Sequence, residues 1–345
     1  MSVYRCNHCG YLAEESATAA GQKMPCARCG QPVTVYGTVF FIEKVLERYA
    51  ATLRELKALK AIEAQEPAPD SPEAVTAPNG RPASQAETDT DFQNTRELAT
   101  ASQHAPLAEW FKARKIQATF DYAAVDTTGY FDDAALQLGT RFELLAPLLD
   151  HLCWAYRKNV PAINVELGKL PQKDGQAINK LCREFYSHTL FARYYYQKPE
   201  KVIRLTLQPA STVRRFFEGG WLEWFALMQG LRVCQQRHVM VAAARGAKLT
   251  FGDEDLHELD VVLLPHGGQP VVIECKSGEF RREIDKYSRL RKRLGLDRAH
   301  FILFAPDLQD EQTASLGAMY ELTFANLRTL PDLLHRRRAL GANHL

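Results

Sequence analysis

The stretch "VVIECKSG" (residues 271–278) places an acid and a base at the end of an apolar, β-branched run. Side chains alternate across a strand, so Glu274 and Lys276 share one face and Cys275 lies on the other. A second apolar run, "LDVVLLP" (259–265), precedes this stretch, and only "HGGQP" (266–270) separates the two. Two β-branched runs joined by a short Gly-rich turn predict a β-hairpin.

The length of the hairpin loop decides where Asp260 lies. A three-residue loop, with Pro265 opposite Gln269, places Asp260 opposite Glu274 on the same face, whereas an even-numbered loop places Asp260 on the far side. Two adjacent carboxylates repel each other unless a cation lies between them. Mg²⁺ or Mn²⁺ commonly binds through such oxygens. The first register therefore predicts a divalent metal site formed by Asp260 and Glu274.

Lys276 lies beside this carboxylate pair. It can orient or deprotonate the attacking water, or neutralise charge that develops on a phosphoryl oxygen, as metal-assisted phosphodiester hydrolysis requires. The alternative interpretation is structural: a buried salt bridge at a strand end, or a charged edge that prevents aggregation.

Three segments together resemble the core of PD-(D/E)xK endonucleases: "GGWLE" (219–223), "ELDVV" (258–262) and "VIECKSG" (272–278). With Lys286-Tyr287 in the basic segment that follows, they are similar to the C-terminal nuclease domain of CRISPR-associated CARF effector nucleases. The resemblance covers about residues 216–330. It implies a mixed sheet flanked by helices, dependence on Mg²⁺ or Mn²⁺, and four catalytic residues: Glu223, Asp260, Glu274 and Lys276.

The rest of the chain departs from that family. Its members carry a Rossmann-like sensing domain that binds a cyclic oligoadenylate, and no segment of this sequence resembles one. The resemblance therefore extends to the nuclease core and its metal, and not to the activating ligand.

Residues 1–37 carry two Cys-x-x-Cys-Gly knuckles, "CNHCG" (6–10) and "CARCG" (26–30). Four thiolates with this spacing predict a zinc ribbon with Cys6, Cys9, Cys26 and Cys29 as the structural Zn²⁺ ligands. His8 is then a bystander, because the cysteines complete the tetrahedral shell. Free or redox-active thiols are the alternative.

Two further segments separate the ribbon from the rest. Residues 38–63 repeat apolar side chains at helical spacing from Ile42 to Leu59, which predicts an amphipathic helix. This helix either forms a coiled coil, making the protein a homodimer, or packs against its own chain. Residues 64–105 are rich in Pro, Ala, Ser, Thr and acids, as is typical of a disordered linker.

Residues 106–212 predict a winged-helix-like α+β domain. Helical periodicity covers 141–159 and 174–188, and two strands, 190–197 and 201–207, follow as a hairpin. Four basic residues of this domain are candidate nucleic-acid contacts: Lys173, Lys180 and Arg183 at the second helix, and Arg193 in the first strand of the hairpin. A domain of this kind is equally suited to binding protein.

Residues 213–335 are expected to form the nuclease domain. A basic run follows the acid-and-lysine strand, and its members either face solvent or contact the phosphate backbone: Arg281, Arg282, Lys286 and Arg289. The expected fold class is therefore α/β. From the N-terminus, we expect a zinc ribbon, an amphipathic helix, a winged-helix-like α+β domain and a C-terminal nuclease core.

The net charge of +2 is nearly neutral, so composition alone indicates no partner. No apolar run approaches the roughly 20 residues that span a bilayer, and the first residues do not resemble a signal peptide. We therefore expect a cytoplasmic, metal-dependent endonuclease that acts on DNA more readily than on RNA, in defence against foreign nucleic acid. The alternative is a DNA-binding regulator whose nuclease-like domain is catalytically idle.

Overall fold

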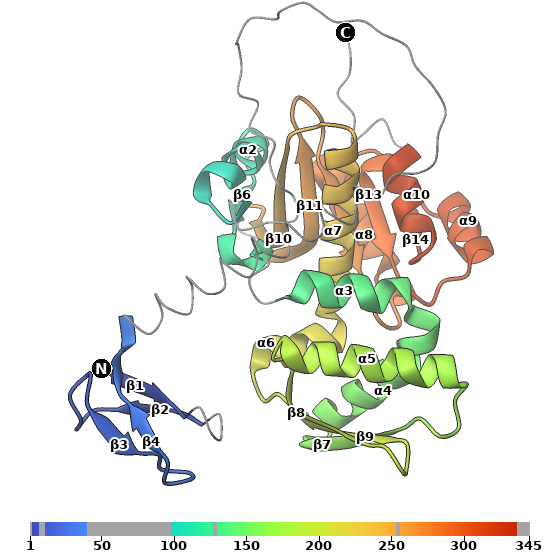
Figure 1. Ribbon diagram of the computed structural model, residues 1–345. Helices are drawn as coiled ribbons and strands as arrows, with labels where there is room; N and C mark the ends of the chain where they lie inside the picture. Colours follow the sequence, from blue (N-terminus) through green and yellow to red (C-terminus); the bar gives the residue numbers. More distant parts are fainter. Residues whose placement is uncertain (1, 7–10, 40–97, 127–129, 253–255, 337–345) are drawn as a thin grey trace, which may run out of the picture. The chain divides into compact units, whose positions relative to one another are not determined.

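The computed structural model describes residues 2–6, 11–39, 98–126, 130–252 and 256–336. These residues belong to two compact units, 1–85 and 86–345 (Figure 1). The predicted amphipathic helix lies outside the described residues except for its first two positions, as do Cys9 and the linker up to residue 97. No helix among the described residues is both long enough and apolar enough to cross a bilayer.

The first unit is a small β structure. Strands β2 (Leu12–Glu15), β1 (Ser2–Arg5) and β5 (Tyr36–Gly37) form one antiparallel sheet. Strands β3 (Lys23–Pro25) and β4 (Pro32–Thr34) form a separate hairpin. Tyr4 and Val35 are buried between them together with two cysteines, so the small core forms around the thiols.

The second unit is built on a six-stranded mixed sheet with the order β14-β13-β12-β11-β10-β6. Its antiparallel half comprises β6 (Gln117–Thr119), β10 (Val241–Thr250), β11 (His257–Pro265) and β12 (Val271–Cys275). Strands β13 (Phe301–Phe304) and β14 (Thr323–Ala325) continue from β12 in parallel. The expected mixed α/β core is confirmed.

Helices cover both faces of this sheet, because the apolar side chains of its central strands alternate between two cores. Val261 and Ile273 face α7 (Trp221–Gln236) and α10 (Thr329–Arg336), whereas Val262 and Val272 face α8 (Ile284–Leu294) and α2 (Ala101–Lys112) (Figure 1). Short 3₁₀ turns, η5 (Arg281–Glu283) and η6 (Arg298–His300), flank α8.

Residues 131–207 form a second layer of structure in the same unit. Helices α3 (Phe131–Thr140), α4 (Phe142–Arg157) and α5 (Gln172–Ser187) accompany an antiparallel sheet with the order β7-β9-β8. Its strands are β7 (Ala162–Glu166), β8 (Phe191–Gln197) and β9 (Val202–Leu207). The two helices and the hairpin that the sequence predicts are present within two residues at each end, and β7 is an additional strand.

The structure differs from the expected linker and domain boundaries near residue 105. Leu98 is buried and α2 begins at Ala101, where the Thr100 side chain accepts a hydrogen bond from the Gln103 amide (3.4 Å). Moreover, β6 pairs with β10 and is therefore an edge strand of the six-stranded sheet. Helix α2 packs on this sheet, so neither element is part of the α+β layer. The turn η2 (Tyr122–Val125) then leads from β6 towards α3.

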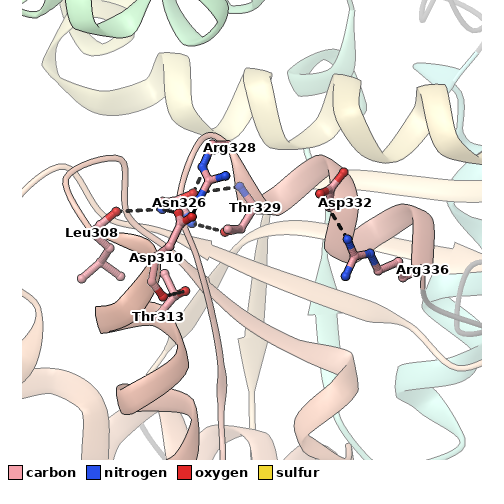
Figure 2. Close-up of polar contacts among 8 residues, drawn as sticks. All are labelled: Leu308, Asp310, Thr313, Asn326, Arg328, Thr329, Asp332 and Arg336. Carbon is pink, nitrogen blue, oxygen red and sulfur yellow. Dashed lines mark hydrogen bonds and ion pairs between the residues drawn. The ribbon is translucent and has the colours of Figure 1, made fainter.

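Two local features shape the connections around the sheet. Helix α6 (Ser211–Arg215) reaches α7 through a π-helical turn, η4 (Phe216–Gly220), in which Gly219 has a φ of 137°. At the other end, buried Asn326 after β14 donates hydrogen bonds to the Leu308 carbonyl and the Asp310 carboxylate, both at 2.8 Å. Figure 2 shows how Asn326 thereby ties the start of α10 to α9 (Asp310–Met319).

Candidate catalytic site

The register of β11 and β12 matches the three-residue loop. Val261 is opposite Ile273 and Leu263 is opposite Val271, and one more step along this register brings Asp260 opposite Glu274. The backbone amide of Cys275 donates a hydrogen bond to Oδ2 of Asp260 over 2.7 Å. Asp260 is therefore anchored to the neighbouring strand at the point where the two strands stop pairing.

Lys276 lies between the two carboxylates. Its Nζ is 3.9 Å from Oδ2 of Asp260 and 3.9 Å from Oε2 of Glu274. Glu274 is only 2% exposed, and its Oε1 is buried without a hydrogen-bond partner among the described residues. Lys276 Nζ also lies 5.2 Å from the centroid of the Tyr287 ring, so the lysine faces α8.

Burial and mutual charge perturb all three groups. Desolvation raises the pKa of Glu274 well above its usual value, and the nearby Asp260 charge raises it further. Desolvation also raises the pKa of Asp260, although Lys276 and the Cys275 amide oppose this change. Burial by itself would lower the pKa of Lys276, but Asp260, Tyr287 and Glu274 together raise it. The protein thus concentrates negative charge that one lysine only partly balances.

The donor set fits a hard divalent cation. Two carboxylates from adjacent strands, one with a buried and unpartnered oxygen, are the ligands that Mg²⁺ and Mn²⁺ prefer. Gly246 on β10 is the residue opposite Asp260, since Arg245 pairs with Val261 and Ala247 with Leu259. It has a φ of 65°, which favours glycine, and a Cβ at this position would lie 3.3 Å from Oε1 of Glu258.

Glu223 does not join Asp260 and Glu274 in a tight cluster. It lies on α7, and its Oε2 accepts a hydrogen bond from Nη1 of Arg245 at 2.8 Å. Burial raises its pKa to about 7; the Arg245 charge opposes this shift, and the Asp260 charge adds to it. Glu223 is therefore within electrostatic range of Asp260 but is paired with an arginine.

Arg245 is the residue of this region that the sequence did not single out. Its Nε donates to the Ala124 carbonyl at 2.8 Å, and its guanidinium lies 4.4 Å from the centroid of the Trp224 ring. The only signal in the sequence was one arginine in the otherwise small and apolar run "VAAARGA" (241–247). Arg245 connects η2, β10 and α7 at the position of Glu223.

The basic run after β12 divides into two groups. Arg281 pairs with Glu279 at 3.3 Å, whereas Arg291 and Lys292 hold Glu321 at 2.8 Å and 3.1 Å. The remaining candidates are exposed and recur at three- and four-residue steps along η5 and α8: Arg282, Lys286 and Arg289. The Lys286 charge opposes the raised pKa of Glu274, so Lys286 is within electrostatic range of this carboxylate.

The candidates on α5 lie apart from the nuclease residues. Lys173, Lys180 and Arg183 are exposed along one side of α5, and its other side, including Ile178 and Phe185, is buried. A cavity of about 460 Å³ between α9, β14 and α10 contains none of the four predicted catalytic residues.

In the first unit, three of the four predicted zinc ligands meet. The sulfurs of Cys6, Cys26 and Cys29 all lie within 4.8 Å of one another, and no other group of three or more His, Cys, Asp or Glu in the described ranges is as close. Three convergent thiols suit a soft metal ion such as Zn²⁺. Cys9 and His8 lie outside the described residues.

Comparison with known proteins gives no family assignment: no protein-family model and no curated protein matches the chain. Among solved structures, protein VC1899 from Vibrio cholerae is similar, with 20% identity and a TM-score of 0.49 over 69% of this chain and 62% of that one. Can2 from Sulfobacillus thermosulfidooxidans, solved with cyclic tetra-adenylate, is similar with 16% identity and a TM-score of 0.47. That match covers 68% of this chain and 61% of Can2. The chain thus spans about three-fifths of the length of each of these proteins.

Proposed function

We propose that this protein is a metal-dependent endonuclease that hydrolyses phosphodiester bonds in nucleic acid. One observation carries the proposal: Lys276 Nζ lies 3.9 Å from a carboxylate oxygen of both Asp260 and Glu274, at the end of a buried strand pair. The resemblance of residues 216–330 to PD-(D/E)xK effector nucleases supports the same assignment and a role in defence against foreign nucleic acid, with DNA as the favoured substrate.

Asp260 and Glu274 would hold the divalent ion, Mg²⁺ or Mn²⁺. When bound, such an ion supplies Lewis-acid stabilisation of phosphoryl charge and lowers the pKa of water. Glu274 contributes a desolvated carboxylate, and the Cys275 amide keeps Asp260 oriented towards it. Glu223, which Arg245 holds at 2.8 Å, would help to position water at the edge of the site.

Lys276 would act on the substrate. Its ammonium is kept protonated by the neighbouring carboxylates and by Tyr287, so it would neutralise negative charge that grows on the phosphoryl oxygens. Arg282, Lys286 and Arg289 on the same side of the sheet would hold the phosphates on either side of the scissile bond. Each role belongs to a different group, so variants can separate them.

The test uses circular substrates, which have no ends for an exonuclease. Purified full-length protein is incubated with circular single-stranded DNA, plasmid DNA and circular RNA, with Mg²⁺, with Mn²⁺ or with no added divalent ion. We expect linear products only with a divalent ion, and from DNA before RNA. Binding of DNA without cleavage of any substrate in either ion would favour the idle, DNA-binding alternative.

A further inference from the structure

The three-stranded sheet of the α+β layer has an outer face that no described element covers. Its inner face is apolar, since Ile203 and Leu205 of β9 are buried in the core with Phe185 of α5. Side chains alternate, so the intervening positions of β7, β8 and β9 point outwards. Figure 1 shows these three strands beyond α4 and α5, away from the six-stranded sheet.

Strand register arranges the outer side chains in rows. Asn164 on β7 is opposite Arg204 on β9, which in turn is opposite Tyr195 on β8. In the next row Ala162, Thr206 and Arg193 lie side by side. Tyr195 is 63% exposed, although a large aromatic side chain is costly to leave in water. The face therefore presents one exposed aromatic ring next to two arginines, with small and polar side chains around it.

The charges of this face favour an anionic partner. Arg193 is exposed and has no ion-pair partner among the described residues. Nε of Arg204 donates to Oε1 of Gln197 at 3.1 Å, which orients the guanidinium along the sheet. Of the acids in this layer, Glu166 pairs with Lys169 at 2.9 Å, whereas Glu200 contacts Gln197 and lies 4.0 Å from Nη2 of Arg204 at an exposed position. Lys198 and Lys201 in the hairpin turn add further positive charge.

We propose that this outer face binds single-stranded nucleic acid, with a base stacked on Tyr195 and phosphates held by Arg193 and Arg204. An exposed tyrosine stacks on any unpaired base, and arginines on either side follow the backbone. In a duplex the bases are stacked on one another and their faces are not available to Tyr195. The chemistry is common to single-stranded DNA and RNA.

This inference goes beyond the proposed cleavage reaction, because the face contains none of the four predicted catalytic residues. Arg193 was already a candidate phosphate contact from the sequence, but the other three candidates of that domain belong to α5 and not to this face. Lys173, Lys180 and Arg183 lie on the solvent side of α5, whose buried side faces the core, while the outer sheet face lies on the other side of that core. If the sheet face binds the single strand, substitutions on it should weaken binding and substitutions on α5 should not. If α5 is the binding surface, the reverse is expected.

The experiment measures fluorescence anisotropy of labelled 20-nucleotide single-stranded DNA, single-stranded RNA and duplex DNA. Every protein is full-length and carries Lys276→Ala, so that a cleaved probe does not complicate the titration. We expect Tyr195→Ala to weaken binding of both single strands about tenfold, and Tyr195→Phe to bind within about twofold of the parent. Duplex affinity should change little.

Charge variants on the two faces are the matched controls. Arg193→Gln with Arg204→Gln should reduce the slope of log affinity against log salt by about 1.4, since each phosphate contact to a single strand contributes about 0.7. Lys180→Gln with Arg183→Gln removes the same charge from α5 and should leave that slope unchanged. The proposal is overturned if the α5 pair alone changes the slope, or if Tyr195→Ala and Tyr195→Phe weaken binding equally. Because Lys276→Ala is present in every protein, these titrations report on binding by the sheet face and not on cleavage at the nuclease site.

Discussion

The backbone amide of Cys275 donates a 2.7 Å hydrogen bond to the carboxylate of Asp260. Backbone pairing between β11 and β12 ends at Val261 and Ile273, so this bond continues the connection through a side chain where the ladder stops. Charge-assisted bonds from backbone amides are short and orienting. Asp260 is thus fixed by a group that only proline, among substitutions at position 275, would remove.

Arg245 should stabilise the region around Glu223. Arg245→Met removes its hydrogen bonds to Glu223 and Ala124 and its contact with Trp224. We expect a loss of about 2 kcal/mol in the free energy of unfolding, because a half-buried carboxylate and a carbonyl lose their donor. Chemical denaturation measures the loss. Arg232→Met, at an exposed position of α7, is the control, and equal losses in the two variants would contradict this account.

Replacement of Gly219, just before α7, should destabilise the protein. Its φ of 137° is strained for any residue with a Cβ, and a Cβ there would lie 3.0 Å from Oγ of Ser277. Gly219→Ala should cost about 1–3 kcal/mol of stability. Gly278→Ala has no neighbour within 4 Å of the new Cβ and should cost much less. Thermal unfolding of the two variants compares them, and similar melting temperatures would argue against strain at Gly219.

Asp132 should make stability depend on pH. Burial raises its pKa to about 6 in the folded protein, despite hydrogen bonds from backbone amides. A raised folded pKa favours the native state below the unfolded value of about 4, and this contribution is lost as the pH rises through 6. Asp132→Asn should therefore gain stability relative to wild type between pH 4 and pH 8, by about 2 kcal/mol.

Denaturation at several pH values measures this difference. Asp133→Asn removes a charge from the same helical turn at an exposed position, so it should show a much smaller change with pH. A difference between wild type and Asp132→Asn that stays constant from pH 4 to pH 8 would exclude the titration of Asp132 as its cause.

The cysteine cluster should bind one zinc ion per chain. Cys26→Ser with Cys29→Ser removes two of the three thiols that meet within 4.8 Å, and should abolish the zinc while the 86–345 unit keeps its unfolding transition. Elemental analysis of protein purified without chelator gives the stoichiometry. Cys153→Ser, at a cysteine of α4 outside the cluster, should retain the metal. Zinc-free wild-type protein would rule out the ribbon.

The hairpin could be predicted because it depends on local rules. Loop length determines the register, and alternation then places Asp260, Glu274 and Lys276 on one face. The pairing of Glu223 with Arg245 could not be predicted in this way, since it requires the packing of α7 against β10. Glu223 was assigned to the site from the resemblance to the nuclease family. No sequence motif indicated Arg245 as its partner.

The start of the second unit was obscured by composition. The segment from Leu98 to Lys112 contains Ser, Gln and Pro106, so it resembles the linker before it, although Thr100 caps a helix there. Strand β7 was missed because it is short: its five residues include only two that are strongly β-forming and apolar, Ile163 and Val165. Both elements are stabilised by contacts that are distant in sequence.

The most direct measurement of the central claim compares the initial rates at which Asp260→Asn and Glu258→Gln cut a circular DNA substrate with Mn²⁺. Asp260 is tied to Cys275 and lies 3.9 Å from Lys276, whereas Glu258 is exposed two residues earlier on the same strand, opposite Lys248. We predict that Asp260→Asn lowers the rate at least about a hundredfold, because it removes a charged ligand of the ion. Glu258→Gln should cut within about threefold of wild type. Wild-type cleavage by Asp260→Asn, or a larger loss in Glu258→Gln, would contradict the assignment of the site.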